Sequence, residues 1–320
     1  MIITRREMIE RLGAFGLAST AVVGGGIALY DQPRNARAQV QAVPNFQMER
    51  AGVYSQISVA RGGTATTNTR AAIHALGGMN TFIKAGDRVM IKPNLAWKRI
   101  PEQAATTNPD LVAELCRLCL DAGAAEVVIF DSPCDPGAAT FKSSGIIAAA
   151  ESVGCRAVFP DKSDYIKLSF GGPVIDQWAV WKELPKFDKV INAAIVKHHC
   201  QSRVTAGMKN WYGILGGDRG LLHQDIHGSI VDLASAIKPT LTVLDAQRVL
   251  MRNGPTGGSL GDVKESKAVA AGIDPVALDA WAIQELEQDI RKVAFMGLAE
   301  ARELGTADWR SLRLKEITAG

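Results

Sequence analysis

Basic and imidazole side chains gather in one stretch of the chain, between residues 187 and 227. The tetrapeptide Lys-His-His-Cys occupies positions 197–200, directly after an apolar run, and Lys209 and Asn210 follow it. Ammonium, imidazole and thiol groups bind anions, transfer protons or ligate metals. The stretch therefore predicts a chemical site, and it indicates the place of that site better than its reaction.

The first functional hypothesis is an enzyme that acts on a small anionic substrate, either a carboxylate or a phosphate. Lys92, Lys197 and Lys209 would form a cationic cradle, and His199 would act as general acid or base. Asp131 would orient His199 or help to hold a divalent metal. The predicted catalytic residues are Lys92, His199, Lys209 and Asp131, and the predicted substrate-binding residues are Asn94, Ser132, Lys197, Thr205, Asn210, Arg219 and Asp245.

Two further histidines raise the alternative of a metal site. His223 and His227 stand four residues apart, which on a helix would place both on one face, as a divalent metal requires. The same motif offers no third ligand, so the metal stays an open alternative, and His223 could instead orient His199. Cys134 and Cys200 fall at predicted strand ends, where they would either join a mixed Cys/His site or form a disulfide.

The second functional hypothesis is a non-catalytic exported protein that binds a ligand, a metal or a cofactor in the same crevice. It predicts stoichiometric ligand without turnover. A third alternative is a redox protein using Cys116 and Cys119. It is disfavoured because the two cysteines share one face of an apolar helical pattern and are better explained as small core residues.

Polar side chains recur at the ends of the predicted strands. In parallel sheets the carboxyl ends of the strands meet at one edge, where ligands bind, so these side chains are predicted to converge in one crevice. Asp274, before Pro275, is first of all a predicted helix cap. Strands are predicted at 87–91, 126–130, 190–196, 240–244 and 267–273, followed respectively by Lys92 and Asn94, by Asp131 and Ser132, by residues 197–200, by Asp245, and by Asp274.

Strands and helices alternate along most of the chain. The segment 87–130 is predicted as strand, helix, strand, with Asn108 as helix cap and Pro109 in the first turn, which is a βαβ unit with parallel strands. A hairpin around residues 178–181 interrupts the alternation. The predicted fold class is α/β: a mostly parallel sheet covered by helices on both faces, in a single domain over residues 39–320 or in two intimately packed lobes.

The first 38 residues resemble a twin-arginine export signal. Arg5 and Arg6 precede an uncharged stretch from residue 12 to residue 30, and Ala36-Arg37-Ala38 is an A-x-A cleavage pattern. The stretch is long enough to serve alternatively as a membrane anchor, but three consecutive glycines make it weakly hydrophobic. We expect cleavage after Ala38, with the twin-arginine export machinery as a partner, a periplasmic mature protein and no stable membrane insertion.

The chain that follows the predicted signal is almost neutral, with 31 basic and 30 acidic residues of the 36 and 33 in the whole sequence. Nucleic acid is not an expected partner, because a phosphate backbone requires a net positive face. No G-x-G-x-x-G fingerprint occurs, which disfavours a dinucleotide enzyme. The expected partner is a small anionic ligand.

Eight collinear motifs resemble those of the domain of unknown function 362 family, and together they cover nearly all of the chain after the predicted signal. The family carries no assigned activity. The motifs are IKPNL (91–95), TTNPDLV (106–112), AGAAEVVIFDSP (122–133), VIN…VKHH…VTAGMKNWYG (190–213), RGLLH (219–223), LTVLDA (241–246), NGPTGG (253–258) and DPVALDA (274–280).

The resemblance implies a role for one residue and the absence of one cofactor. The family's Lys-Thr-His appears as Lys197-His198-His199, so His199 occupies the position of the family histidine and His198 replaces a threonine. Many relatives append a cysteine-rich ferredoxin-type segment that holds iron–sulfur clusters. This sequence has no closely spaced run of four cysteines, so no iron–sulfur cluster is expected.

Overall fold

The computed structural model describes residues 40–47 and 56–319, and the predicted export signal lies outside these residues. The chain divides into residues 1–41 and residues 42–320. Within the described part of the second unit, nine strands form one mixed sheet in the order β11-β1-β10-β9-β7-β2-β3-β4, with β8 paired to β7 alone. Their bounds are β1 Gln56–Arg61, β2 Arg88–Pro93, β3 Glu126–Phe130, β4 Arg156–Val158, β7 Lys189–His199, β8 Arg203–Thr205, β9 Leu241–Leu250, β10 Val263–Gly272 and β11 Arg313–Thr318.

Most strands of this sheet run in one direction. The five strands β4, β3, β2, β7 and β9 are mutually parallel, and β1 and β11 share their direction. Only β10 and β8 run the opposite way among the described strands. The strand predicted at 267–273 is β10, which begins earlier, at Val263, and runs antiparallel to β9. A parallel pair would need a crossover connection, usually an α-helix, and no α-helix lies between β9 and β10.

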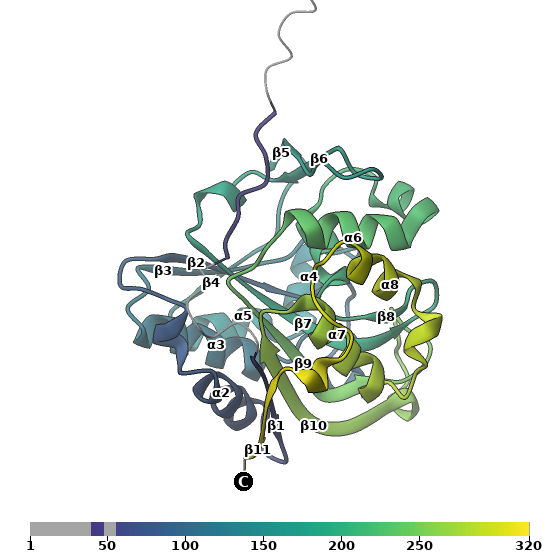
Figure 1. The fold of residues 1–320 in the computed structure, drawn as a ribbon. Helices are drawn as coiled ribbons and strands as arrows, with labels where there is room; N and C mark the ends of the chain where they lie inside the picture. Colours follow the sequence, from purple (N-terminus) through teal and green to yellow (C-terminus); the bar gives the residue numbers. More distant parts are fainter. Residues whose placement is uncertain (1–39, 48–55, 320) are drawn as a thin grey trace, which may run out of the picture. The chain divides into compact units, whose positions relative to one another are not determined.

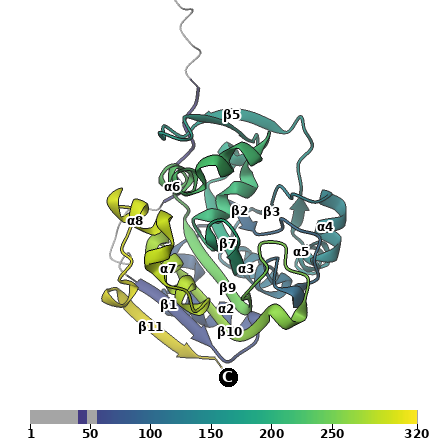
Figure 2. The ribbon, with the colours of Figure 1, turned by 90° about the vertical axis from the view of Figure 1, so that its right-hand side faces the viewer.

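Helices cover both faces of the sheet, and the predicted α/β fold class is confirmed (Figure 1). Each face has its own apolar cluster. One contains side chains of α2 (Ala65–Ala75), α3 (Pro109–Asp121), α4 (Gly137–Ser143) and α5 (Ile146–Glu151); the other contains side chains of α6 (Ile226–Ala236), α7 (Pro275–Glu285) and α8 (Ala294–Ala301). The view in Figure 2 shows α7 and α8 on one side of β9 and β10.

Short 3-10 helices connect these elements. They comprise η1 Met79–Thr81, η2 Pro101–Gln103, η3 Leu184–Lys186, η4 Lys209–Ile214, η5 Arg219–Asp225, η6 Leu260–Asp262, η7 Ile290–Lys292 and η8 Trp309–Ser311. Two of them, η4 and η5, occupy the stretch between β8 and α6 in which the sequence places most of its chemistry.

The α-helix boundaries follow from capping residues. Asn108 accepts a hydrogen bond from the Asp110 backbone N–H at 2.9 Å, and Pro109 occupies the first helical position of α3, as predicted. Asp274 accepts from the backbone N–H groups of Val276 and Ala277 and caps α7. Since β10 runs antiparallel, Asp274 lies at the opposite sheet edge from the ends of β2, β3 and β7, and its prediction as a crevice residue is wrong.

Two strands are longer than predicted because a neighbour pairs with their ends. The end of β7 pairs with β8, in the register Lys197 to Thr205 and His199 to Arg203, so the strand continues through His199. The end of β9 pairs with β10, which places Asp245 inside the ladder opposite Val269. Asp245, which was predicted to follow the strand at 240–244, thus lies within β9.

The tryptophan-bearing segment forms a separate antiparallel hairpin of β5 (Tyr165–Ser169) and β6 (Gln177–Trp181) (Figure 1). It contacts the loops that follow the sheet. The Trp178 indole N–H donates to the Gly216 carbonyl at 2.8 Å, and the Tyr165 and Ser132 hydroxyls lie 2.7 Å apart. The hairpin therefore forms part of the surroundings of the segment between η4 and η5.

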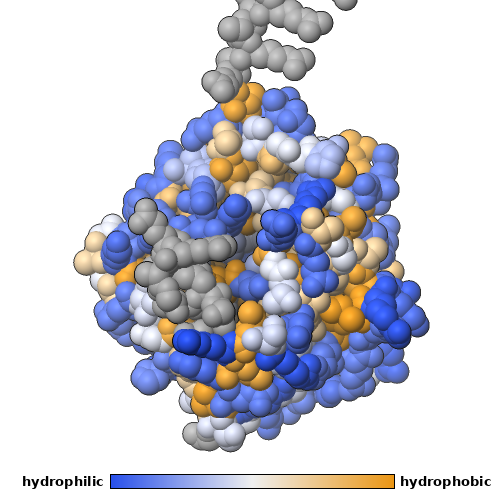
Figure 3. All heavy atoms as spheres, in the orientation of Figure 1, coloured by the Kyte–Doolittle hydropathy of each residue, from blue (hydrophilic) through white to orange (hydrophobic). Residues whose placement is uncertain are grey.

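No helix in the residues that the structure describes is long and apolar enough to cross a membrane. Hydrophilic residues cover much of the face drawn in Figure 3, with apolar residues interspersed among them.

Candidate functional site

A cavity of about 580 Å³ lies beyond the ends of β2, β3 and β7. Residues from all three strand ends and from η4 and η5 line it. The structure brings eleven of the predicted site residues to this one cavity: Lys92, Asn94, Asp131, Ser132, Lys197, His199, Thr205, Lys209, Asn210, Arg219 and His223. The sheet geometry explains this gathering, because the three parallel strands end at the same edge.

Lys92 and Asp131 form a buried ion pair at the base of the cavity. The Lys92 Nζ lies 3.0 Å from the Asp131 Oδ1, and both side chains are almost completely buried. Burial lowers the pKa of Lys92, and the adjacent Asp131 carboxylate opposes that change. Asp131 also accepts hydrogen bonds from the backbone N–H groups of Leu95 and Ser132. Its carboxylate is thus occupied by Lys92 and by the two loops that follow β2 and β3.

An asparagine network connects Lys92 and Lys197. Asn210 donates to the Lys92 carbonyl and to Asn192 Oδ1, while its own Oδ1 accepts from Asn94 at 3.1 Å. Lys197 Nζ donates to Asn94 Oδ1 at 3.0 Å and to the Ala105 carbonyl at 2.6 Å. Burial, followed by the charge of nearby Lys209, lowers the pKa of Lys197 to about 7. Lys197 therefore has acceptors but no carboxylate partner among the described residues.

Among the cations that line the cavity, Lys209 has the fewest partners in the described residues. It is only 8% exposed, and no hydrogen-bond acceptor or carboxylate in the described residues contacts its Nζ. The ammonium lies 4.6 Å from the centroid of the Tyr212 ring, a cation–π contact. Burial lowers the pKa of Lys209 to about 8, and Arg219 adds to the decrease. An ammonium held in this way is electrostatically unsatisfied unless an anion enters the cavity.

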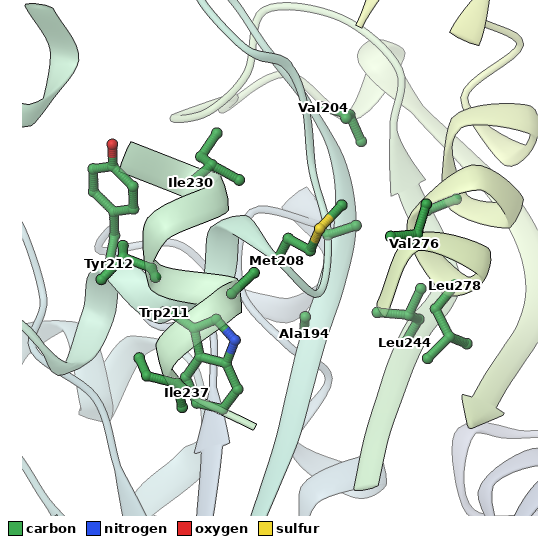
Figure 4. Packing of buried hydrophobic residues seen from close by; sticks show 14 of the residues in the cluster. Ala194, Val204, Met208, Trp211, Tyr212, Ile230, Ile237, Leu244, Val276 and Leu278 are labelled. Carbon is green, nitrogen blue, oxygen red and sulfur yellow. The ribbon is translucent and has the colours of Figure 1, made fainter. Parts of the chain in front are cut away.

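The apolar core holds the segment that carries Lys209. Figure 4 shows Met208 and Trp211 packed between the strand that carries Ala194 and the helix that carries Ile230. Met208 and Trp211 flank Lys209 in the sequence, and both are buried. The backbone N–H groups of Gly207 and Met208 also donate to the Asp279 carboxylate of α7. Lys209 therefore extends from a rigid base, which preorganises it for a ligand.

His199 is a neutral hydrogen-bond donor in this arrangement. Its Nδ1 accepts from the backbone N–H groups of Gln201 and Ser202, both at 3.2 Å, so the proton of the neutral ring resides on Nε2. Burial, then the charges of Lys209 and Lys197, lowers the pKa of His199 to about 2. The backbone rather than Asp131 orients the ring. A ring with this pKa stays neutral near pH 7 and presents Nε2–H as a donor, and its general acid or base role stays a prediction.

The neutral state of His199 gives a direct prediction. Its ring ¹⁵N and ¹³C resonances should stay constant between about pH 5 and 8, because its pKa is lowered to about 2. A pH titration followed by NMR of the folded protein measures this, with the His199→Gln variant supplying the assignment. A titration midpoint between pH 6 and 7, as in an ordinary exposed histidine, would contradict the assignment of a buried neutral donor.

His223 and His227 do not form a metal pair. His223 lies in η5 and donates from Nδ1 to the Arg219 carbonyl at 3.2 Å, and its ring centroid lies 6.4 Å from that of His199. His227 lies in α6, packs against Phe295 and is not among the cavity-lining residues. The two residues belong to different helices, so the one-face spacing does not apply. No group of three His, Cys, Asp or Glu side chains in the described residues has the proximity that a metal ion needs.

Asp245 also lies outside the cavity lining, in contrast to its prediction as a substrate-binding residue. It is buried within β9 and accepts from the backbone N–H groups of Asn108 and Gln247. Burial raises the pKa of Asp245 to about 6. The residue therefore positions the start of α3 rather than a ligand.

Arg219 and two cysteines complete the wall. The Arg219 guanidinium donates to the carbonyl groups of Ser132, Tyr212 and Pro133, which ties the β3 loop to η4 and η5. Cys134 and Cys200 both line the cavity and are free thiols in this structure, rather than the disulfide that was the alternative to a mixed Cys/His site. Cys116 and Cys119 are buried in α3, in agreement with their interpretation as core residues.

The sequence model of a family described as Domain of unknown function (DUF362) matches residues 89–284, more than half of the chain. The chain belongs to this family. A thylakoid-associated protein of Synechocystis sp. is 29% identical over 256 residues, which cover 74% of this chain and 75% of the relative. Among solved structures, the lactate racemase apoprotein from Thermoanaerobacterium thermosaccharolyticum is similar with a TM-score of 0.39 and 13% identity, over 69% of this chain and 55% of that chain.

All cavity-lining residues of this DUF362 protein, from Lys92 to Pro255, fall within the matched span. Two buried residues that position the site were not predicted. Asn192 of β7 accepts from Asn210 and donates to the Gly207 carbonyl, and Asp279 holds the loop before Lys209. Each is a single polar residue in an apolar element, VINAAIV or PVALDAWAI. A single polar residue in an apolar element indicates a buried hydrogen bond, because a buried polar group requires a partner. This pattern could have identified Asn192 and Asp279 from the sequence.

Proposed function

We propose that this DUF362 protein is an enzyme that acts on a small carboxylate or phosphate compound bound in the cavity. The observation that carries the proposal is the charge of the lining. Lys92, Lys197, Lys209 and Arg219 face one acid, Asp131, which is already paired with Lys92. The remaining positive charge is complementary to an anion, and it includes Lys209, which has no acceptor among the described residues.

The proposed contacts follow from the state of each side chain. Lys209 would provide the main charge–charge contact, with Lys197 and Arg219 contributing longer-range attraction. The Nε2–H of His199 would donate a hydrogen bond to an oxygen of the substrate. A neutral imidazole can also stabilise negative charge that develops during a reaction, as an oxyanion-hole donor does. The Lys209 amine, with a pKa of about 8 and no acceptor among the described residues, is then free to exchange a proton with the substrate near neutral pH.

A ligand screen followed by an activity assay tests this proposal. Purified protein is mixed with small mono- and dicarboxylates, 2-oxo acids and phosphate esters, and the shift in Tm is recorded for each. Compounds that raise the Tm of the wild type, but not that of Lys209→Met, are incubated with the protein and followed by ¹H and ³¹P NMR. Conversion to a product supports an enzyme; Lys167→Met, which removes an exposed lysine of β5, is the matched control.

A non-catalytic binding protein is the second candidate, and one observation favours it. Asp131 is the single carboxylate in the described lining, and its oxygens are occupied by Lys92, Leu95 and Ser132. His199 is neutral, with Nδ1 already accepting two hydrogen bonds. No free carboxylate base is thus available in the described lining. Under this alternative, native mass spectrometry would find stoichiometric anion or metal, and no compound that raises the Tm would be converted.

We also propose that the protein is exported by the twin-arginine route and acts outside the cytoplasm. The support is the Arg5-Arg6 pair, the uncharged stretch after it and the Ala36-Arg37-Ala38 pattern. Replacing Arg5 and Arg6 by lysine should retain the full-length chain in the cytoplasm, while the wild type appears in the periplasm without residues 1–38. Cell fractionation with mass analysis measures both. An unchanged distribution for the lysine variant would refute the route.

A further inference from the structure

A second cavity, of about 500 Å³, lies at the start of α2. The loop between β1 and α2 forms one wall, and the end of β9 and the start of β10 form another. None of its lining residues belongs to the cavity described above. The site proposed for the anionic substrate therefore does not account for this second cavity.

The first wall presents backbone N–H donors. The N–H groups of Thr64 and Ala65, two of the lining residues, have no acceptor within the part of the chain that the structure describes, because they precede the first intrahelical bonds of α2. No acidic side chain lies in the first turn of this eleven-residue helix. Successive free N–H groups at a helix N-terminus attract anions, because the helix dipole adds to their partial positive charge.

Two glycines and one asparagine hold this wall in shape. Gly62 has a φ of +90°, and a Cβ on Gly63 would lie 2.3 Å from the Thr67 Oγ1. The buried Asn68 side chain bonds to both the N–H and the carbonyl of Gly63 and donates to the Lys267 carbonyl at 2.9 Å. The loop is thus fastened to β10 in a conformation that larger residues would disrupt.

The opposite wall contributes two side chains without partners. Gln247 is 8% exposed, and its Nε2 is buried without a hydrogen-bond acceptor. The half-buried Arg248 has neither an ion pair nor a hydrogen-bond acceptor among the described residues. A buried amide and a half-buried guanidinium without acceptors are both expected to gain from an oxygen-rich ligand.

Two acids also line the cavity, and both are exposed to solvent. Glu265 lies opposite Arg248 in the β9–β10 register but forms its contact with Lys267, at 4.0 Å. Asp110 lies in the first turn of α3. Because water screens exposed carboxylates far more than buried groups, they weaken the attraction of an anion at the rim without cancelling it.

We infer that this second cavity binds the phosphate group of a small phosphorylated compound, held by the free N–H groups of α2, by Arg248 and by Gln247. The phosphate oxygens would accept from the backbone donors on one wall and from the guanidinium on the other. The cavity is larger than a phosphate ion, which leaves room for the organic part of the compound.

Isothermal titration with inorganic phosphate tests this inference, starting from the Lys209→Met protein so that the first cavity contributes little. Adding Arg248→Gln should weaken binding by about tenfold or more, the usual consequence of losing a charge-assisted hydrogen bond. Ala65→Pro should weaken it by a smaller factor, because proline removes one N–H at the first helical position. The fold should tolerate this proline, since Thr64 has φ −73° and ψ 169°, which suits the residue before proline.

Thermal melts first establish that each variant is folded. The titrations then decide whether the second cavity binds phosphate. Phosphate binding that survives Lys209→Met and is lost with Arg248→Gln supports the second site. Absence of phosphate binding in both the wild type and Lys209→Met, its loss through Lys209→Met alone, or unchanged binding in Arg248→Gln overturns it. Ala65→Pro separates the backbone contribution from a surface attraction to Arg248.

Discussion

The Asp131→Ala variant should lose about 3–5 kcal/mol of unfolding free energy, the usual cost of removing one partner from a buried ion pair. Lys92 would remain in the interior at 0% exposure without its carboxylate. The variant also deletes the acceptor for the backbone N–H groups of Leu95 and Ser132, so two loops at the cavity lose a common anchor. Urea denaturation at neutral pH measures the loss.

A double variant separates the charge from the packing. Lys92→Met combined with Asp131→Asn removes both charges and retains an acceptor oxygen for one of the two backbone N–H groups. It should recover a large part of the stability that Asp131→Ala loses, because no unpaired charge stays buried. A loss below about 1 kcal/mol in Asp131→Ala, the range of an exposed salt bridge, would show that water reaches this pair and that it does not form the base of the cavity.

The Lys209→Met variant should be more stable than the wild type and should no longer respond to the anionic ligand. Methionine has a similar length and needs no counter-charge, whereas the Lys209 ammonium is buried without an acceptor in the described residues. Lowering a pKa from 10.5 to about 8 costs the protonated form about 3 kcal/mol at 1.36 kcal/mol per pKa unit. Loss of the Tyr212 contact offsets part of the gain, so about 1–3 kcal/mol should remain.

The pH dependence of stability has a defined sign. Between about pH 8 and pH 10.5 the unfolded chain keeps the Lys209 proton while the folded chain releases it. The unfolded state therefore binds more protons, and the contribution of Lys209 to stability rises with pH across that window and is least favourable below it. The unfolding free energy of Lys209→Met should exceed that of the wild type by a smaller amount as the pH increases from 8 to 10.

The exposed lysine Lys167 provides the matched control for this measurement. Lys167→Met should change the unfolding free energy by less than about 0.5 kcal/mol and leave the ligand response intact. If Lys209→Met instead destabilised the protein by several kcal/mol, Lys209 would be a structural residue with a partner. The proposal that Lys209 lowers the stability of the free protein and is retained for ligand binding would then be wrong.

The order of elements could be predicted from the sequence wherever local chemistry decides it. Asn108 followed by Pro109 marks the start of α3, and the apolar runs at 126–130 and 190–196 lie within β3 and β7. Strand direction at the sheet edge could not be predicted in the same way. Whether β10 pairs parallel or antiparallel with β9 depends on the connection between them, and nothing in the strand residues themselves records it.

Convergence of the cavity residues could be predicted because their order along the chain matches the ends of adjacent parallel strands. Lys92, Asp131 and Lys197 come from three neighbouring strands, β2, β3 and β7. The pattern was wrong where a strand continues beyond its apolar run, as at Asp245, and where two histidines belong to different helices, as at His223 and His227. The length of β9 depends on its pairing with β10, and the separation of the two histidines depends on the break between η5 and α6.

The protonation states of the site depend on burial and on neighbours that only the fold brings together. His199 has the type and position of a general acid or base, yet two backbone N–H groups and two nearby lysines keep it neutral. Lys209 resembles any other lysine in the sequence until its surroundings are known. Asn192 and Asp279, which hold the site in place, carry no chemistry of their own.

The side-chain titration of Lys209 tests the central claim most directly. Its ¹³Cε and ¹⁵Nζ resonances, assigned by their loss in Lys209→Met, are followed against pH in the free protein and with a saturating anionic ligand. We predict a pKa of about 8 in the free protein, because burial disfavours the charge, and a clear increase when the anion supplies the missing partner. A pKa near 10.5 in the free protein, unchanged by the ligand, would mean that Lys209 is already solvated or paired and that the cavity is not an anion site.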